Sequence, residues 1–368
     1  MRQIVLLIVF IAVNIASADP IKVGMLAPLS GDFASYGKTM QDGVNLAVKD
    51  LARAGIEVKA YFQDACLGAG VNTAVNDLIG LKHIDAIVGN FCVAAMPIAA
   101  PLINQHQLFT IHSATATDKI LNASPYILSI NGAVKVEAEK IAEYAALKLR
   151  AKTAAIYYIG TDFGEDYQRY FNERFSKLGG TVVGSYLNAV GDNDFRSAIL
   201  LSKAKQPDVI FAVHLGNTLG LLLKQIRQVG MTLPVLGVYE AEDPSIVEVA
   251  GKAAEGLTFY RPDHESFLEN SVRKHFVTDF KAAFGYEPGV LAANAYDGTI
   301  LAVQGIKACQ RAHASTALGD CVAAQIKAEA SIVGASGSFN FSNDRQASRG
   351  LILMQVTAGQ FVKVASAH

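Results

Sequence analysis

The chain has 368 residues, of which 51% are hydrophobic and 18% are charged. This composition is typical of a folded protein with a large core and excludes a disordered chain. The formal net charge is −1 and no segment is strongly basic, so there is no electrostatic reason to bind nucleic acid or an anionic membrane. The length favours two lobes over a single core.

The N-terminal segment has the pattern of a cleaved signal peptide. Arg2 supplies a positive charge, residues 4–15 are apolar apart from Asn14, and Ala16-Ser17-Ala18 places small residues where a signal peptidase cuts. The apolar run is about 12 residues long, short of the roughly 20 that span a bilayer, which disfavours an uncleaved anchor. Without a cysteine near the cleavage pattern, no lipid anchor is expected. We therefore expect an exported protein whose mature chain begins at Asp19.

Export makes the four cysteines informative, because an even number in an oxidising compartment predicts two disulfides. Three pairings are possible, and the sequential one closes the shortest loops: Cys66 with Cys92, and Cys309 with Cys321. No pair has the C-x-x-C spacing of zinc or redox sites, so no metal site is expected. A hydrolase that uses Cys92 with His112 is the competing interpretation, but it would be expected to carry a lone thiol.

From residue 19 the pattern alternates between strand and helix. Strands are predicted at residues 21–26, 58–62, 85–88 and 108–111, the third stopping at Gly89-Asn90. Helices are predicted between them from apolar residues at helical spacing. One such run extends from Met40 to Leu51, and another ends with Leu78 and Leu81. Strands that are apolar on both faces, separated by amphipathic helices, predict a parallel sheet covered on both sides.

The pattern then restarts. Further strands are predicted at residues 154–159, 181–186, 209–213 and 233–237, and helices at 167–178 and 218–229. Two successive arrays predict two lobes that join near residues 128–134, where Asn131-Gly132 interrupts the pattern. After residue 259 come helices at 269–284 and 289–307, then strands at 338–341, 351–356 and 361–364. Because no low-complexity linker separates the arrays, several chain crossings are expected.

Ligands of open parallel sheets bind at the carboxyl ends of the strands, and five loops lie at such positions. They are residues 29–37, 89–94, 112–117, 160–165 and 238–243. Tyr36 and Phe163 are candidate apolar walls, free backbone N–H groups in the second and third loops could hold an anion, and an acid in the fifth could pair with an ammonium. Ordinary packing of both aromatics, helix capping by Ser or Thr, and a solvated acidic run are the alternatives.

Enzyme motifs are absent from the sequence. It contains no G-x-S-x-G, H-E-x-x-H or Walker A pattern. Gly68-Ala69-Gly70 lacks the third glycine of a dinucleotide fingerprint, and His106 and His112 are six residues apart, which is not a helical metal pair. No catalytic residue and no cofactor are therefore expected.

The loops resemble those of a known family, the type I periplasmic solute-binding proteins of the leucine/isoleucine/valine-binding group, which serve ABC importers. The similar stretches run in family order through the mature chain: I-K-V-G-M-L-A-P-L-S-G-D-F-A-S-Y-G (21–37), Q-D-A-C (63–66), V-G-N-F-C (88–92), S-A-T (113–115), D-F-G-E-D (162–166), A-G-K-A-A-E-G (250–256) and A-Y-D-G (295–298). Each is weak alone, but together they are specific.

The resemblance implies an α/β protein with two Rossmann-like lobes, a Venus flytrap with three hinge crossings and a ligand between the lobes. Its expected domains are the signal peptide 1–18, an N-terminal lobe of 19–130 with 261–341, and a C-terminal lobe of 131–260 with 342–368. It also supports the Cys66–Cys92 disulfide. By matching position, the loop after Cys92 and the residues Ala114 and Thr115 would hold a ligand carboxylate. The expected ligand-binding residues are Tyr36, Phe91, Val93, Ala94, Ser113, Ala114, Thr115, Phe163, Tyr239 and Glu240.

Three departures concern the ligand. Amino-acid binders of this group usually have Ser after the second cysteine, where this chain has Val93. An ungapped match places Tyr239 where Glu is expected, with Glu240 one residue late. An aromatic is also usual at residues 215–217, which read Leu-Gly-Asn here.

The resemblance implies a monomeric, non-catalytic periplasmic protein that passes a small carboxylate ligand to an inner-membrane ABC permease. A branched-chain or hydrophobic amino acid is the expected ligand. Aromatic acids, keto acids, amides or urea are the alternatives, as is delivery to a sensor. An exported hydrolase that uses Cys92 or Ser113 with His112 is the remote alternative. Neither metal, cofactor nor nucleic acid is expected.

Overall fold

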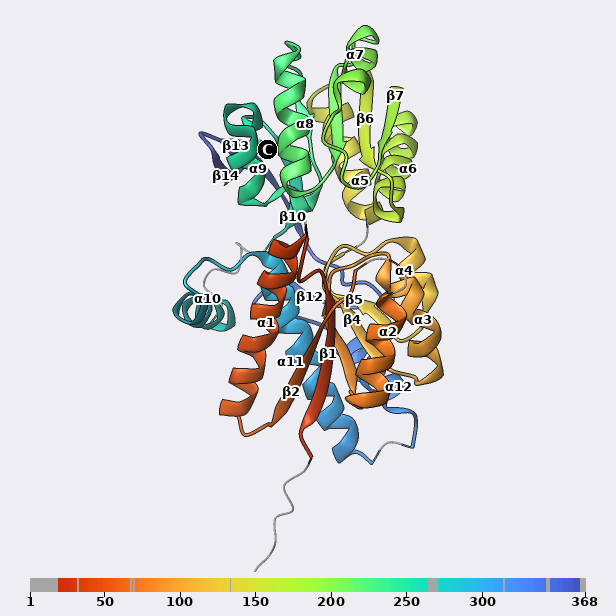
Figure 1. Ribbon diagram of the computed structural model, residues 1–368, viewed down its shortest axis with the longest axis vertical. Helices are drawn as coiled ribbons and strands as arrows, with labels where there is room; N and C mark the ends of the chain where they lie inside the picture. The colour runs from red at the N-terminus through yellow and green to blue at the C-terminus, as the bar shows by residue number, and fades with distance from the viewer. Residues whose placement is uncertain are drawn as a thin grey trace, which may run out of the picture.

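A computed structural model describes residues 19–31, 33–66, 68, 70–132, 134–263, 271–313, 315–341 and 345–364. The expected signal peptide, residues 1–18, lies outside the described residues. Within them the strands form two large sheets, one in each half of an elongated molecule, and a short two-stranded ribbon (Figure 1). No helix in this part of the chain combines the length and apolar character needed to cross a bilayer.

The first sheet is parallel and has the order β2-β1-β3-β4-β5. Its strands are β1 (Ile21–Ala27), β2 (Val58–Asp64), β3 (Ala86–Asn90), β4 (Phe109–His112) and β5 (Ile127–Ser129). Four of them confirm the predicted strands. The expectation that the third strand ends before Gly89 was wrong: Gly89 adopts a positive φ of 63° inside the strand, and the register shifts there while pairing continues to Asn90.

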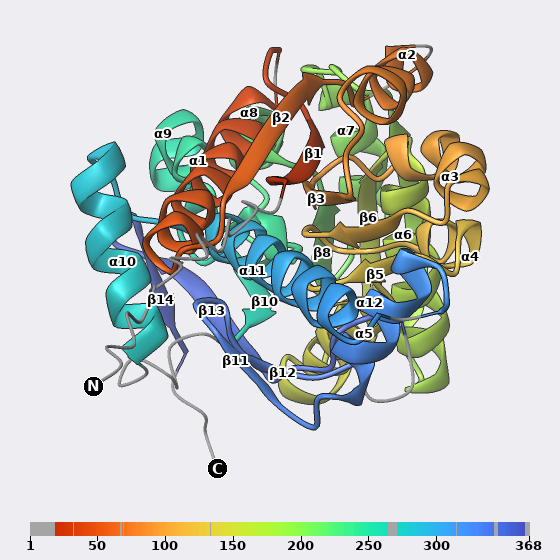
Figure 2. The same ribbon diagram turned by 90° about the horizontal axis from the view of Figure 1, so that it is seen from below.

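Helices cover both faces of this sheet. One face carries α1 (Ala34–Arg53), α11 (Val290–Arg311) and α12 (Leu318–Ala328), and the other carries α2 (Gly70–Asn76), α3 (Ala95–Gln105) and α4 (Asp118–Ala123) (Figure 2). A π-helical turn, Asp77–Leu81, follows α2, and α10 (Ser271–Phe284) packs outside α1. A Cβ on Gly43 would lie 2.2 Å from the carbonyl oxygen of Ala292, so α1 and α11 approach too closely for a side chain there.

The second sheet has the order β14-β13-β10-β9-β8-β6-β7. Its parallel strands are β6 (Thr153–Ile159), β7 (Thr181–Asn188), β8 (Val209–Val213), β9 (Val235–Leu236) and β10 (Thr258–Pro262). The last two strands, β13 (Leu351–Thr357) and β14 (Gln360–Lys363), add to its edge in antiparallel pairs. These two strands confirm the predictions at residues 351–356 and 361–364, but their antiparallel pairing was not predicted.

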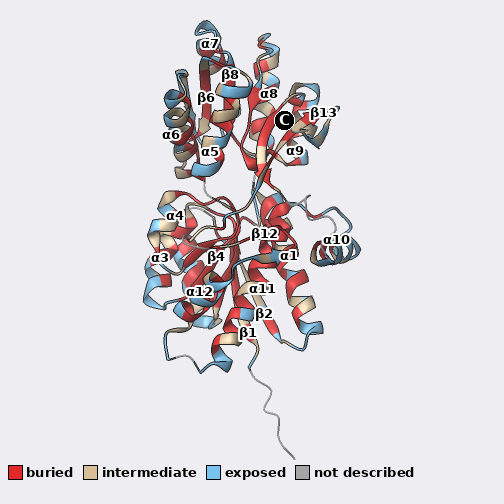
Figure 3. Cartoon of the chain, turned by 180° about the vertical axis from the view of Figure 1, so that it is seen from behind, coloured by how far each residue is buried: buried red, intermediate tan, exposed pale blue. Residues whose placement is uncertain are grey.

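Alternating side chains send apolar residues to both faces of the second sheet. On β6, Ala154 and Ile156 join the core beneath α5 (Val134–Glu143) and α6 (Asp162–Lys177), whereas Ala155 and Tyr157 join the core beneath α8 (Gly216–Gln228). The remaining helical segments of this half are a π-turn at Tyr144–Lys148, α7 (Arg196–Ala204), 3-10 turns at Tyr239–Ala241 and Gly251–Ala254, and α9 (Pro244–Ala250). Buried strands enclosed by half-exposed helices are visible in both halves (Figure 3).

The chain crosses between the two sheets three times. It passes from β5 to α5, from β10 toward α10, and from the ribbon of β11 (Ile332–Gly334) and β12 (Gly337–Phe339) to β13. The fold is therefore the expected two-lobed α/β architecture. For the bounds of the lobes we propose 19–130 with 261–341, and 131–260 with 342–368, since these divisions fall at the crossings. Both expected disulfides, Cys66–Cys92 and Cys309–Cys321, are present.

Candidate ligand site between the lobes

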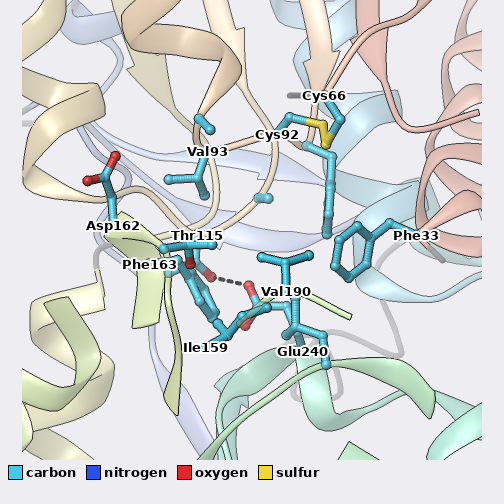
Figure 4. A pocket seen from close by; sticks show the side chains of 15 residues that line it. Phe33, Cys66, Cys92, Val93, Thr115, Ile159, Asp162, Phe163, Val190 and Glu240 are labelled. Atoms are coloured by element: carbon cyan, nitrogen blue, oxygen red, sulfur yellow. Dashed lines mark hydrogen bonds between the residues drawn. A yellow bond between two sulfur atoms is a disulfide. The ribbon is translucent and has the colours of Figure 1, made fainter. Parts of the chain in front are cut away.

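A pocket of about 80 Å³ lies where the carboxyl ends of the two sheets face each other (Figure 4). Its walls are mostly apolar and come from both lobes. None of the described residues that line it is a lysine or an arginine. The lining residues are Phe33, Cys66, Phe91, Cys92, Val93, Ala94, Ala114, Thr115, Ile159, Thr161, Asp162, Phe163, Val190, Leu215 and Glu240.

The first-lobe wall is built by the loops that follow β1, β2, β3 and β4. The Cys66–Cys92 disulfide joins two of these loops and itself lines the pocket. Phe91 is stacked on Tyr36 of α1, with ring centroids 5.0 Å apart and an interplanar angle of 13°. The apolar wall is therefore held in place by a covalent bond and by an aromatic pair.

The second-lobe wall centres on Phe163 at the start of α6. Thr161 caps this helix, its hydroxyl accepting a bond from the N–H of Gly164 at 3.3 Å. A Cβ on Gly164 would lie 1.9 Å from the carbonyl oxygen of Ile159, so glycine allows the helix to start directly against the end of β6. Phe163 packs edge-to-face on Tyr167 at 4.8 Å and also lines the pocket. Phe163 therefore has both of the roles that the sequence suggests as alternatives: it packs in the core and it forms part of the pocket wall.

The polar end of the pocket is formed by Thr115 and Glu240. The Thr115 hydroxyl donates to Oε1 of Glu240 at 2.8 Å and accepts from Nδ2 of Asn131 at 2.9 Å. Oε2 of Glu240 is buried without a hydrogen-bond partner among the described residues. Burial raises the pKa of Glu240 to about 7, against the opposing effect of the Thr115 hydroxyl.

Tyr36 does not line this pocket but connects the lobes beside it. Its hydroxyl accepts from the N–H of Gly216 at 3.2 Å and donates to the carbonyl oxygen of Glu240 at 3.5 Å. Burial, followed by the nearby Asp243 carboxylate, raises the pKa of the Tyr36 phenol. Tyr36 therefore supports the pocket from behind Phe91.

The structure brings most of the expected site residues together. The expected residues that line the pocket are Phe91, Val93, Ala94, Ala114, Thr115, Phe163 and Glu240. Ser113 lies behind the wall with its hydroxyl buried and unpartnered among the described residues. Tyr239 is buried and lines a separate cavity of about 350 Å³ on the other side of Tyr36. Of the two candidates for the acid position, Glu240 is the one at the pocket.

Several residues of the site were not predicted from the sequence. Phe33, Ile159 and Val190 line the pocket, and Glu137 of α5 lies behind it. Glu137 accepts a 2.5 Å bond from the Tyr167 hydroxyl, and burial followed by repulsion from Glu240 raises its pKa well above the usual value. Its helical spacing from the buried residues Val134 and Ile141 would have placed it on the apolar face of α5.

The structure removes the basis for the Cys–His hydrolase. Cys92 is bonded to Cys66, so it carries no thiol. Both ring nitrogens of His112, and the hydroxyl of Ser113, have no hydrogen-bond partner among the described residues, so the neighbouring pair does not form the contact that would activate a serine.

Two α/β lobes joined by three crossings, with a pocket between the strand ends that is lined from both lobes, define a hinged binding protein. A family model described as "Periplasmic binding protein" matches residues 20–360, and the chain therefore belongs to that family.

Named relatives agree with this family. A "Leucine-, isoleucine-, valine-, threonine-, and alanine-binding protein" of Pseudomonas aeruginosa is 28% identical over 306 residues, covering 79% of each chain. The Leu/Ile/Val-binding protein of Escherichia coli K12 is 26% identical over 259 residues, 68% of this chain and 69% of that one.

Solved structures share the fold. A leucine-binding protein from Thermotoga maritima superposes with a TM-score of 0.84 at 24% identity, covering 94% of this chain and 98% of that one. A solute-binding protein from Rhodopseudomonas palustris BisB5, solved with 3,4-dihydroxybenzoic acid, gives 0.82 at 25% identity, covering 95% and 97%.

Proposed function

We propose that this chain is the periplasmic substrate-binding protein of an ABC importer and that it binds a small apolar amino acid. The observation that carries the choice of ligand is Glu240: a buried carboxyl at the pocket, with one oxygen unpartnered among the described residues. A ligand ammonium would supply both the missing donor and the missing positive charge.

The rest of the pocket suits the remainder of such a ligand. Phe91, Val93 and Phe163 offer apolar contact to an aliphatic side chain. Because Lys and Arg are absent from the described lining, a ligand carboxylate would depend on backbone N–H groups of the loops around Ala94 and Ala114. A zwitterion with no net charge matches this arrangement better than a free anion does. The pocket is lined from both lobes, so entry requires the lobes to open.

An aromatic acid is the second candidate, favoured by Phe33, Phe91 and Phe163 in the lining and by Val93 where the family usually has a serine. It would have to place its carboxylate near Glu240, which is unfavourable unless Glu240 is protonated. Binding of such an acid should therefore weaken as the pH rises through about 7, the pKa of Glu240. An amino acid should show the opposite trend, since its ammonium requires the ionised carboxylate.

The test is calorimetric titration of refolded, ligand-free protein with L-leucine, with its keto acid 4-methyl-2-oxopentanoate and with benzoate, from pH 6 to pH 8. We expect L-leucine to bind and Glu240→Gln to weaken it roughly ten- to a hundredfold, as for loss of a charged hydrogen bond. Binding of the keto acid or benzoate, but not L-leucine, would reject the amino acid. Delivery to a permease rather than a sensor is tested separately, by ATPase stimulation of a reconstituted importer.

A further inference from the structure

A continuous chain of hydrogen bonds leads from the third crossing into the pocket. Nη1 of Arg349 donates to Oδ1 of Asn294 at 3.3 Å, and Nδ2 of Asn294 donates to Oδ1 of Asn131 at 3.2 Å. Nδ2 of Asn131 then donates to the Thr115 hydroxyl at 2.9 Å, which donates to Glu240 at 2.8 Å. Five side chains from five separate segments are thereby linked.

The direction of this chain is determined at both ends. A guanidinium can only donate hydrogen bonds, and the Glu240 carboxylate, once ionised above its pKa of about 7, can only accept them. Nδ2 of Asn294 also lies 3.1 Å from the carbonyl oxygen of Ser113, which can only accept, so the amide orientation of Asn294 follows from two neighbours. Asn131 must then offer its oxygen to Asn294 and its N–H to Thr115. The hydroxyl proton of Thr115 is consequently left to point at Glu240.

The network is buried and attached to the crossings. Asn131, Asn294 and Thr115 are each 0% exposed, so solvent water does not compete for their hydrogen bonds. Asn131 lies in the first crossing and Arg349 in the third. Nη2 of Arg349 donates to the carbonyl oxygen of Ile130 at 2.5 Å, which joins these two crossings directly.

We propose that Asn131, Asn294 and Arg349 are positioning residues that direct the Thr115 hydroxyl to Glu240 and so hold the Glu240 carboxylate ready for a ligand ammonium. The part of this role that concerns the ligand rests on the proposed function. The orientation of Thr115 in the ligand-free protein does not, and it can be measured alone.

The informative variant is Asn131→Asp, which has nearly the same shape. A carboxylate at this position cannot donate to Thr115 and instead accepts its hydroxyl proton, so Glu240 loses its donor. In ligand-free protein with ¹³C-labelled glutamate, the Glu240 carboxyl, assigned by its disappearance in Glu240→Gln, should titrate at higher pH than in wild type. The affinity for L-leucine should fall roughly ten- to a hundredfold.

Because the new carboxylate adds charge as well as removing a donor, the variant is repeated in a Thr115→Val background. Glu137, Tyr36, Tyr167 and Tyr239 also face Glu240 and are unchanged in both backgrounds. If Asn131 acts through the Thr115 hydroxyl, Asn131→Asp should have much less effect on the Glu240 titration once that hydroxyl is gone. Equal effects in both backgrounds would mean that charge alone acts and would overturn the proposal.

Two further variants keep the result decisive. Thr115→Ser retains the hydroxyl, so Asn131→Asp should still shift the Glu240 titration in that background, as it does in wild type. In Asn294→Asp, the new carboxylate still accepts from Arg349 but no longer donates to Asn131. This variant should therefore shift the titration of the Glu240 carboxyl in the same direction as Asn131→Asp does, and it replaces Asn131→Asp if that protein does not fold. Failure of wild-type protein to bind L-leucine would reject the proposed ligand, whereas an unchanged Glu240 titration in folded Asn131→Asp or Asn294→Asp protein would reject the positioning role.

Discussion

At the scale of single residues, the pocket and its surroundings contain ionisable groups held out of water. Glu240 and Glu137 are buried near one another, and buried His112, at the end of β4, has no hydrogen-bond partner among the described residues. Groups of this kind reduce the stability of the empty protein, since folding removes them from solvent without full compensation. A bound ligand that satisfies one of them recovers part of that loss, which couples binding to stability.

The pH dependence of stability should reveal Glu240. A glutamate in the unfolded chain titrates near 4.5, whereas the pKa of folded Glu240 is about 7. Between these values the folded protein binds more protons than the unfolded chain, so this group lowers stability as the pH rises, by at most about 1.4 kcal/mol per pH unit, with no further change above about 7. In urea unfolding of ligand-free protein, Glu240→Gln should lack this component, and Glu329→Gln, an exposed control, should retain it. Equal pH profiles for wild type and Glu240→Gln would contradict the prediction.

His112 should act in the opposite direction. Burial lowers its pKa from 6.5 to about 4, so the unfolded chain binds the extra proton first as the solution is acidified. Stability from this group is complete above pH 6.5 and is lost as the pH falls toward 4. His112→Gln should reduce the acid sensitivity of the melting temperature between these values, whereas the exposed His106→Gln should not. The prediction fails if both variants keep the wild-type slope.

At the scale of elements, the two disulfides can be compared directly, because they should stabilise the fold by similar amounts but only one of them lies at the pocket. Cys66–Cys92 joins two loops of the pocket wall, whereas Cys309–Cys321 joins α11 to α12 and does not line the pocket. Their sequence separations are 26 and 12 residues. Loop-closure entropy gives stabilisations of about 3.5 and about 3 kcal/mol respectively.

Replacing each pair by serines should therefore lower the free energy of unfolding by similar amounts, about 3 kcal/mol. Only the Cys66→Ser/Cys92→Ser protein should also lose affinity for L-leucine, because its change alters the pocket wall. The Cys309→Ser/Cys321→Ser protein, assayed where it is fully folded, should bind normally. Urea unfolding and calorimetry measure the two quantities, and equal losses of affinity in both proteins would refute the local role of the first disulfide.

Elements with strong local patterns could be predicted from the sequence, and those that depend on distant partners could not. The strands β1, β2, β4, β6 and β8 are apolar runs bounded by turn residues, and each appeared where expected. β5 has only three residues, too few to show a period. β13 and β14 were predicted as strands, but the antiparallel pairing of β13 with β10, far away along the chain, was not. The loops of the site could be predicted in the same way, because the loops at the carboxyl ends of parallel strands meet at one edge of the sheet. Val190 could not, because the turn after β7 in which it lies has no sequence pattern of a binding loop.

At the scale of the whole molecule, the lobes touch at a second place. Helix α4 of the first lobe and helix α6 of the second face each other in Figure 1. We refer to the contacts between these two helices as the interlobe clasp. Asp118 binds Arg169 at 3.3 Å and accepts from the Tyr170 hydroxyl, and Lys119 pairs with Asp162 at 3.0 Å. Asp162 also lines the pocket, so the clasp lies at its edge.

The clasp should favour the closed form before any ligand arrives. Exposed ion pairs contribute only about 0–1 kcal/mol each, so it biases the opening equilibrium rather than locking it. Asp118→Ala should increase the radius of gyration of ligand-free protein in small-angle X-ray scattering, and raised salt should do the same to wild type. Saturating ligand should restore the compact form, and the apparent dissociation constant should rise a few-fold, because less of the free protein is in the binding-competent state.

The matched control is Asp194→Ala, which removes an exposed 2.6 Å ion pair with Arg196 inside the second lobe and leaves the lobe contacts unchanged. It should alter neither the radius of gyration nor the affinity. If Asp118→Ala matches this control in both measurements, the Asp118 contacts of the clasp contribute nothing to closure, and other contacts between the lobes, such as those of Tyr36, Thr115 and Glu240, hold them together. A larger radius with unchanged affinity would instead show that the ligand binds one lobe first and closes the other afterwards.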